Sequence, residues 1–144
     1  NALFIAFHAL QHYGSGIALH HLCDWAMILK HNGLQLPLEL ESKPFRQGVY
    51  AMTQLCNRYL GTSVPVDGGE KIAEVMMGEI MHPKYETVVP CTNKVGIILS
   101  KTQRLFHSHH LKSSVFDISL GKRIWKSVII HLRNPETIFG RNEK

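Results

Sequence analysis

The stretch NALFIAFHALQHYGSGIALHHLCDWAMILKHNG, residues 1–33, determines the predicted fold. Apolar residues recur every three or four positions over residues 3–13, the spacing of one helical face. Gly14-Ser15-Gly16 ends this first helix. A second helix is expected from residue 17 to residue 31, apolar on most sides, with Asn32-Gly33 tolerating the left-handed backbone that closes a helix. The two helices and their short loop predict an αα-hairpin.

The rest of the chain also shows helical periodicity, separated by segments rich in proline and glycine. Residues 34–44 contain two prolines and are predicted to be a connection. Residues 83–92 are predicted to be either an extended crossing segment or a single edge strand. Further helices are expected at residues 45–60, 70–81, 93–111 and 120–132. We therefore predict an all-α bundle of five or six helices over residues 1–134, followed by a polar tail at residues 135–144.

The composition is that of an ordinary globular chain, with 44% hydrophobic and 19% charged residues among 144. Its three cysteines, Cys23, Cys56 and Cys91, are far apart and form no CxxC, which argues against a disulfide framework or a zinc ribbon. Cys23 and Cys56 are expected in the core, and a reducing cytoplasm is the simplest compartment. No apolar run approaches the length of a membrane span. Because Asn1 leads directly into an apolar stretch, we expect a piece of a longer protein.

Positive charge is concentrated in the C-terminal portion. Residues 1–86 carry 6 Lys and Arg against 8 Asp and Glu, whereas residues 87–144 carry 10 against 3. This asymmetry suggests an anionic partner such as nucleic acid, although a solvated face or a surface that docks on an acidic domain explains it equally simply. No base-reading motif accompanies it. The candidate anion-binding residues are Lys101, Arg104, Lys122 and Arg123.

The densest polar cluster lies in the first hairpin. His8 and His12 are four residues apart and share a helix face, and the next helix carries His20, His21 and Asp24. Folding of the hairpin is expected to bring His12 near Asp24 or His20. Such a cluster suits either a divalent metal ion or a hydrogen-bonded polar seam between two helices, with Asp24 partly buried and paired with a histidine. No HExxH is present, and no histidine is directly followed by aspartate.

Residues 1–13 and 16–26 carry a resemblance. They are similar to the helical C-terminal half of the uncharacterised nucleotidyltransferase family common in Bacteroidetes, within the polymerase-β-like superfamily. In that family a helix with HxxxH precedes a helix with an L-x-D-[WY]-A type motif, here Leu22-Cys23-Asp24-Trp25-Ala26. His12 and Asp24 match the motif, and His20 stands where the family often shows a basic residue.

The resemblance implies a parent protein with an N-terminal nucleotidyltransferase domain, in which an Asp-x-Asp pair and a third carboxylate hold Mg²⁺ for a nucleoside triphosphate. This chain has only Asp24, Asp67 and Asp117, and none forms Asp-x-Asp. It would therefore be an accessory portion with no catalytic residue, cofactor or metal site of its own, binding substrate through His12, His20 and Asp24. The alternatives are a non-enzymatic helical interaction module, whose basic C-terminal face binds nucleic acid or an acidic partner, and a metal-dependent hydrolase at the first hairpin.

Overall fold

The computed structural model describes residues 2–33, 36, 42–82, 94–117, 119, 121, 125 and 129. Over these residues it contains five helices and no strand, which confirms the all-α prediction. The helices are α1 (Ala2–His12), α2 (Leu19–His31), α3 (Lys43–Tyr59), α4 (Glu70–Met81) and α5 (Lys94–Ser113). The helix expected at residues 70–81 has the bounds that the sequence predicted.

The chain begins with the predicted αα-hairpin, in which α1 packs against α2. The turn between them needs glycine, because Gly14 and Gly16 have φ angles of 74° and 122°, in the left-handed region. The Gly14 N–H donates a 2.8 Å hydrogen bond to Oε2 of Glu79 on α4. The hairpin turn is thereby tied to a helix that follows it by more than fifty residues.

Helix α3 begins earlier than the sequence predicted. Pro44 was assigned to the preceding connection, but it lies in the first turn of α3. The first N–H groups of a helix have no intrahelical partner, so proline is well tolerated there. Ser42 precedes this turn, and its Oγ accepts a 3.3 Å hydrogen bond from the Phe45 N–H. The proline therefore starts a helix instead of separating two.

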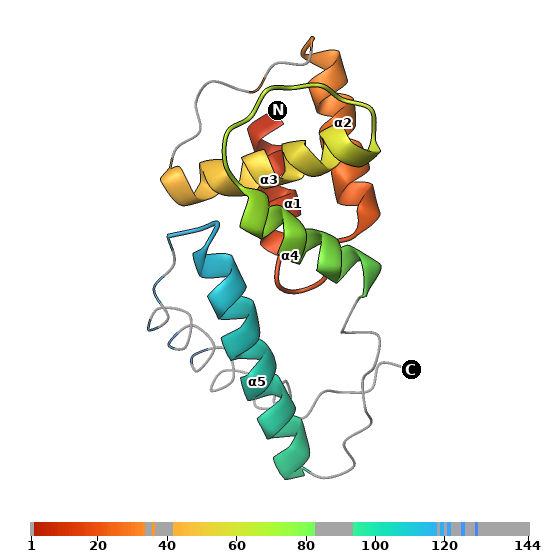
Figure 1. The fold of residues 1–144 in the computed structure, drawn as a ribbon. Helices are drawn as coiled ribbons and strands as arrows, with labels where there is room; N and C mark the ends of the chain where they lie inside the picture. Colours follow the sequence, from red (N-terminus) through yellow and green to blue (C-terminus); the bar gives the residue numbers. More distant parts are fainter. Residues whose placement is uncertain are drawn as a thin grey trace.

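Helix α3 crosses the middle of the molecule and packs against α1, α2 and α4 (Figure 1). It contributes the largest share of the buried core, through Phe45, Val49, Ala51, Met52, Leu55 and Cys56. Polar contacts also lie inside this core: Trp25 Nε1 of α2 donates a 2.9 Å hydrogen bond to Thr53 Oγ1. Thr53 Oγ1 in turn donates to the Val49 carbonyl at 2.8 Å. Both side chains are fully buried, so this bond fixes how α2 is rotated against α3.

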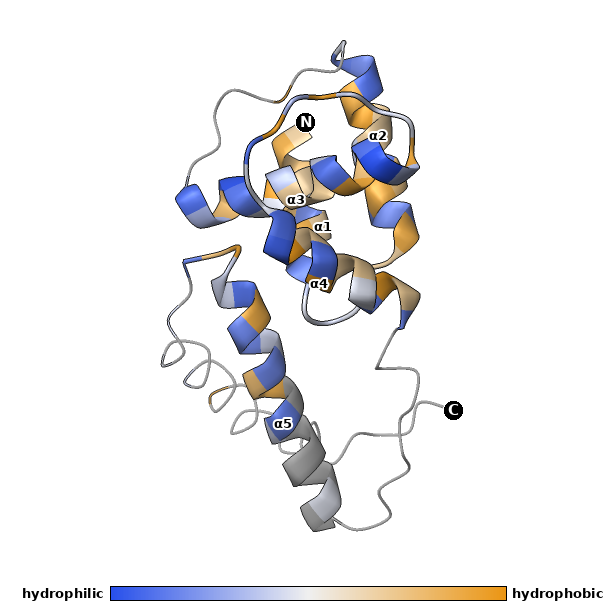
Figure 2. Cartoon of the chain, in the orientation of Figure 1, coloured by the Kyte–Doolittle hydropathy of each residue, from blue (hydrophilic) through white to orange (hydrophobic). Residues whose placement is uncertain are grey.

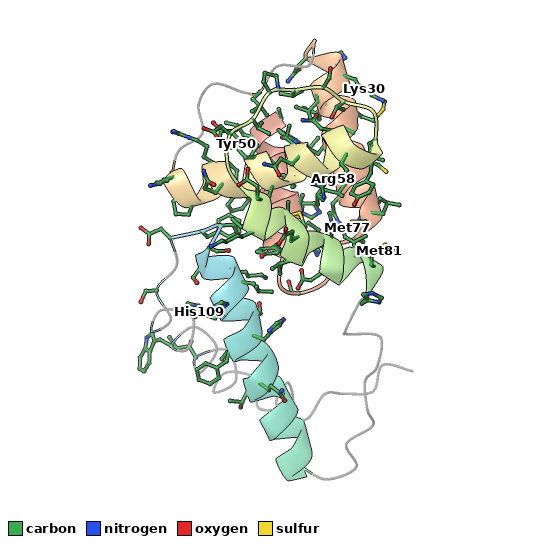
Figure 3. The ribbon with its side chains drawn as sticks, in the orientation of Figure 1. Lys30, Tyr50, Arg58, Met77, Met81 and His109 are labelled. Atoms are coloured by element: carbon green, nitrogen blue, oxygen red, sulfur yellow. The ribbon has the colours of Figure 1, made fainter. Side chains whose placement is uncertain are left out.

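The connection from α3 to α4 is organised by one side chain. Asn57 Nδ2 donates to the Val64 carbonyl at 2.7 Å, and its Oδ1 accepts from the Thr62 hydroxyl at 2.7 Å and the Val64 N–H at 3.0 Å. At the start of the same connection, Lys30 Nζ in the last turn of α2 donates to the Leu60 carbonyl at 3.3 Å (Figure 3). These bonds hold the loop across the ends of α2 and α3.

The C-terminal end of α5 faces the other helices and its N-terminal end points away from them (Figure 1), and Leu111 near that C-terminal end packs against the core. Val115, just after α5, is fully buried, and a Cβ placed on Gly48 of α3 would lie 2.9 Å from its Cγ1. Phe116 packs edge-on against Phe7, with ring centroids 5.3 Å apart. In Figure 2 the described part of α5 mixes hydrophilic with hydrophobic residues, unlike the largely apolar α1. The turn after α5 thus completes the core beside α1 and α3.

Several predictions fall wholly or largely on residues that the structure does not describe. The connection predicted at residues 34–44 is described only at residues 36 and 42–44. The predicted segment at residues 83–92, which includes Cys91, most of the sixth helix and the polar tail lie outside the described residues. Residues 121, 125 and 129 of the expected sixth helix are described, and they are helical. The domain boundary at residue 134 stays a prediction.

We expect Thr53→Val to lower the free energy of unfolding by about 1–3 kcal/mol, because valine keeps the shape but leaves the buried Trp25 N–H without an acceptor. Chemical denaturation followed by circular dichroism measures the change. Ser63→Ala removes an exposed hydroxyl and should change the same quantity by less than about 0.5 kcal/mol. Equal stability of Thr53→Val and the unmodified chain would contradict the role of this bond.

A second prediction concerns the crossing of α3 and α4 at Gly69. This residue has a φ of 90°, and a Cβ there would lie 2.7 Å from the Ala51 nitrogen and 2.8 Å from the Gln47 carbonyl oxygen, both backbone atoms. Gly61 also has positive φ, at 67°, but meets nothing within 4 Å. Gly61→Ala should therefore cost about 1–2 kcal/mol of stability from backbone strain alone. Gly69→Ala should lower the free energy of unfolding by about 1–3 kcal/mol more than Gly61→Ala does, because its methyl group would overpack against the backbone of α3. Similar losses of stability in the two variants would contradict the close approach of Gly69 to α3.

Candidate functional site

Four histidines gather beside the turn of the first hairpin. His8 and His12 lie one helical turn apart near the end of α1, with ring centroids 5.0 Å apart. His20 and His21 lie in the first turn of α2, and their rings are 3.9 Å apart. The two helices run back along each other from a short turn, so the end of one and the start of the other are neighbours. The expected histidine cluster therefore forms.

The ring that joins the two helices belongs to His21. Its centroid lies 4.6 Å from that of His12 and 5.9 Å from that of His8. His8, His12 and His21 each offer a ring nitrogen, and these three atoms all lie within 4.8 Å of one another. Burial increases across the group: His8 is exposed, His12 is half-buried, and His21 is only 4% exposed. The cluster thus runs from solvent to the edge of the core.

The backbone at the start of α2 holds the His21 ring in place. Nδ1 of His21 lies 3.1 Å from the Ala18 nitrogen and 3.2 Å from the Ala18 carbonyl oxygen. With its proton on Nε2, the ring accepts from the Ala18 N–H and caps the helix. With its proton on Nδ1, the ring donates to the Ala18 carbonyl and leaves the Nε2 lone pair available. Both neutral tautomers of His21 therefore have a partner.

Burial and neighbouring positive charge favour the neutral form of two of these rings. The pKa of His12 is lowered from its ordinary value, first by burial and then by His8, Lys112 and His20. The pKa of His21 is also lowered, first by burial and then by His20, despite the favourable hydrogen bond to Ala18. A cationic imidazole is disfavoured in both places because it loses hydration and faces like charge.

The predicted substrate-binding residues are only partly brought together. His12 and His20 lie close enough for their charges to interact, as expected. Asp24, expected to be partly buried and paired with a histidine, is exposed instead, and no hydrogen bond or ion pair joins it to a histidine of the described chain. The buried stripe of α2 consists of His21, Leu22, Trp25, Ala26 and Leu29, and Asp24 lies outside it.

The same rotation of α2 corrects one of the two cysteine predictions. Cys23 was expected in the core but is exposed, because it lies on the solvent side of α2 beside Asp24. Cys56 is buried as predicted, and its Sγ donates to the Leu22 carbonyl at 3.3 Å. Burial raises the pKa of the Cys56 thiol to about 12, so it is an inert core residue.

His21 is the residue that the sequence reasoning left out of the binding set. His12 and Asp24 match the family-like motif and His20 stands where that family often shows a basic residue, whereas His21 corresponds to no position of the motif. The available signal was its position four residues before Trp25, which puts both on one face of α2. Because His21 lies on the buried face of α2 and faces the HxxxH pair of α1, it is the histidine that connects the two helices.

The proposed anion-binding residues cannot be placed in this site. Lys122 and Arg123 lie outside the described residues, as do the side chains of Lys101 and Arg104. One basic residue of the same segment does approach the histidines: Lys112, in the last turn of α5, contributes to lowering the pKa of His12. The histidine cluster therefore has a lysine at its border.

No family model matches the chain, and neither do any of the curated proteins or solved structures compared with it. In the described part of the chain, no helix is both long enough and apolar enough to cross a membrane.

The lowered pKa values of His12 and His21 predict a dependence of stability on pH. Unfolding returns both rings to their ordinary pKa of 6.5, so below about that pH the unfolded chain binds more protons than the folded one. The melting temperature should therefore fall as the pH is lowered from about 7.5 to about 5.5. His12→Ala should reduce this slope, because it removes one of the two rings with a lowered pKa. A slope in His12→Ala as steep as that of the unmodified chain would contradict the assignment.

Proposed function

We propose that this chain is the helical substrate-binding portion of a nucleotidyltransferase-like protein, and that His12, His20 and Asp24 contact the nucleotide, the acceptor or the catalytic domain. Two observations support the proposal. The first 26 residues resemble the helical half of that family, and the three side chains lie on accessible parts of one hairpin. The observation that carries the proposal is that His20 and Asp24 are both exposed on α2.

His20 and Asp24 are four residues apart on α2 and both are exposed, so they form one polar strip along the helix. His12 extends this strip towards α1, because its ring is close enough to His20 for their charges to interact. Neither His20 nor Asp24 is needed for the core, which uses the opposite side of α2. Polar side chains with no structural task, gathered beside a fixed hairpin, suit ligand recognition.

The chemistry of the strip suits the uncharged parts of a nucleotide. A neutral imidazole carries one donor and one acceptor, and a carboxylate accepts from hydroxyl and amino groups. Sugar hydroxyls and base edges offer the complementary groups. Because burial and like charge disfavour the imidazolium at His12, this histidine is suited to hydrogen bonding and not to neutralising a phosphate. Lys112 contributes positive charge at the border of the cluster.

In this proposal the reaction itself belongs to an N-terminal domain of the same polypeptide. Nucleotidyl transfer needs clustered carboxylates to hold Mg²⁺ against the triphosphate, and the three aspartates of this chain are far apart in sequence. The chain's own contribution is to bind and orient a substrate beside that domain. The free thiols of Cys23 and Cys56 suit a reducing compartment, and we place the protein in the cytoplasm.

The complete reading frame and a binding measurement test this proposal. Nucleotidyltransferase domains of the kind that the resemblance implies bind the triphosphate at a helix that starts with Gly-Ser, so the upstream sequence should encode this Gly-Ser pair followed by Asp-x-Asp. In the full-length protein with Mg²⁺, His20→Ala and Asp24→Asn should weaken nucleotide or acceptor binding about 5- to 10-fold, as expected for one lost hydrogen bond each. His31→Ala, an exposed histidine elsewhere on α2, is the matched control.

Two results would overturn the proposal. One is an upstream sequence without the Gly-Ser and Asp-x-Asp elements. The other is affinity in His20→Ala and Asp24→Asn equal to that of His31→Ala. Both variants change exposed side chains, so retention of the circular dichroism spectrum is expected and shows that any loss of binding is local.

A further inference from the structure

We propose that His8, His12 and His21 form a binding site for a divalent transition metal ion such as Zn²⁺, with one coordination position open to solvent. The site stands independently of the proposed function, because it rests on the positions of three side chains within the first hairpin.

The spacing of the three rings is close to that of a metal site. A tetrahedral zinc ion with bonds of about 2.0–2.1 Å holds its ligand atoms about 3.3 Å apart. The three ring nitrogens lie within 4.8 Å of one another. His8 is exposed and His12 only half-buried, so small side-chain rotations towards the fixed His21 ring are sufficient to close the difference.

His8 and His12 supply two ligands from one helix face, because residues four apart on a helix lie one above the other. The third ligand comes from a different helix, so an ion at this site would join α1 to α2. The hairpin turn is itself held by the bond from the Gly14 N–H to Glu79, which limits movement of the two helices. The binding geometry is therefore largely formed before an ion arrives.

The surroundings of His21 match those of a metal-bound histidine. Metal-binding imidazoles commonly donate their second ring N–H to a backbone carbonyl, which fixes the tautomer and the ring orientation. The Ala18 carbonyl oxygen lies 3.2 Å from Nδ1 of His21 and provides this partner. Nε2 is then the atom left for the ion. Burial and neighbouring charge also favour neutral His12 and His21, the form that binds metal.

The ligand set selects the class of metal. Three imidazoles suit zinc, copper, nickel or iron, whereas magnesium and calcium prefer oxygen ligands. Asp24 and Cys23 lie on the exposed side of α2 and are not among the three groups of this cluster. Three protein ligands leave a fourth position for water or a small ligand, as in catalytic zinc sites and unlike closed structural ones. The exposed His8 places that position towards solvent.

The alternative is a polar seam in which the rings only pack against each other and cap α2. That arrangement requires no ion and explains the bond between His21 and Ala18 equally well. The two explanations differ in one measurable property. A seam has no affinity for metal beyond that of scattered surface histidines, whereas the proposed site binds one ion per chain and depends on His8.

The test is a titration of the purified chain, freed of any polyhistidine tag, with Zn²⁺ by calorimetry and with Co²⁺ by visible absorption. His8→Ala and His12→Ala are the test variants, because both side chains are outside the core and the fold should survive their loss. His31→Ala is the matched control, being an exposed histidine on α2 that is not part of the cluster.

We expect one equivalent of Zn²⁺ to bind, and Co²⁺ to develop the absorption of a four- or five-coordinate site. Loss of an outer partner of a metal ligand costs about 10- to 100-fold in affinity, so loss of His8 or His12 should cost at least as much. His31→Ala should bind as the unmodified chain does. Absence of stoichiometric binding, or an affinity in His8→Ala equal to that of His31→Ala, would overturn the proposal.

Discussion

The buried hydrogen bond from Trp25 to Thr53 sets how α2 is rotated against α3. It lies in a fully buried position, joins α2 to α3, and is continued by the bond from Thr53 to the Val49 carbonyl. A buried indole N–H usually has an acceptor, so this bond favours the observed rotation of α2 about its axis. Helix α3 in turn packs against α1 and α4, so the same contact orients the hairpin within the bundle.

The histidine cluster follows from that rotation. His21 lies one helical turn before Trp25 and is therefore directed inwards, against α1, where His8 and His12 share a face. His20 and Asp24 fall on the accessible side for the same reason. One face of α2 thus contributes a buried imidazole to a possible metal centre, while the adjacent face presents polar groups to a ligand. The two proposals concern neighbouring surfaces and do not compete for the same side chains, except at His12.

The sequence predicted the helices well because their limits are marked by local chemistry. Gly14 and Gly16 end the first helix, Gly69 precedes α4, and the bounds of α4 were predicted correctly. The prediction that Pro44 belongs to a connection was wrong, because a proline in the first turn of a helix and a proline between two helices look alike in sequence. The apolar periodicity of α2 also did not predict which of its sides is buried, because so many of its residues are apolar that they form no narrow stripe. The exposure of Cys23 and Asp24, and the burial of His21, are decided by contacts with α1 and α3 that local sequence does not contain.

The central claim is that the fold brings His8, His12 and His21 together as ligands. X-ray absorption spectroscopy of the chain loaded with one equivalent of Zn²⁺ tests it most directly, because the spectrum reports the type and number of ligand atoms. We predict three imidazole nitrogens and one further light atom at bond lengths of about 2.0–2.1 Å. A sulfur ligand, which would implicate Cys23, or fewer than three imidazoles would contradict it.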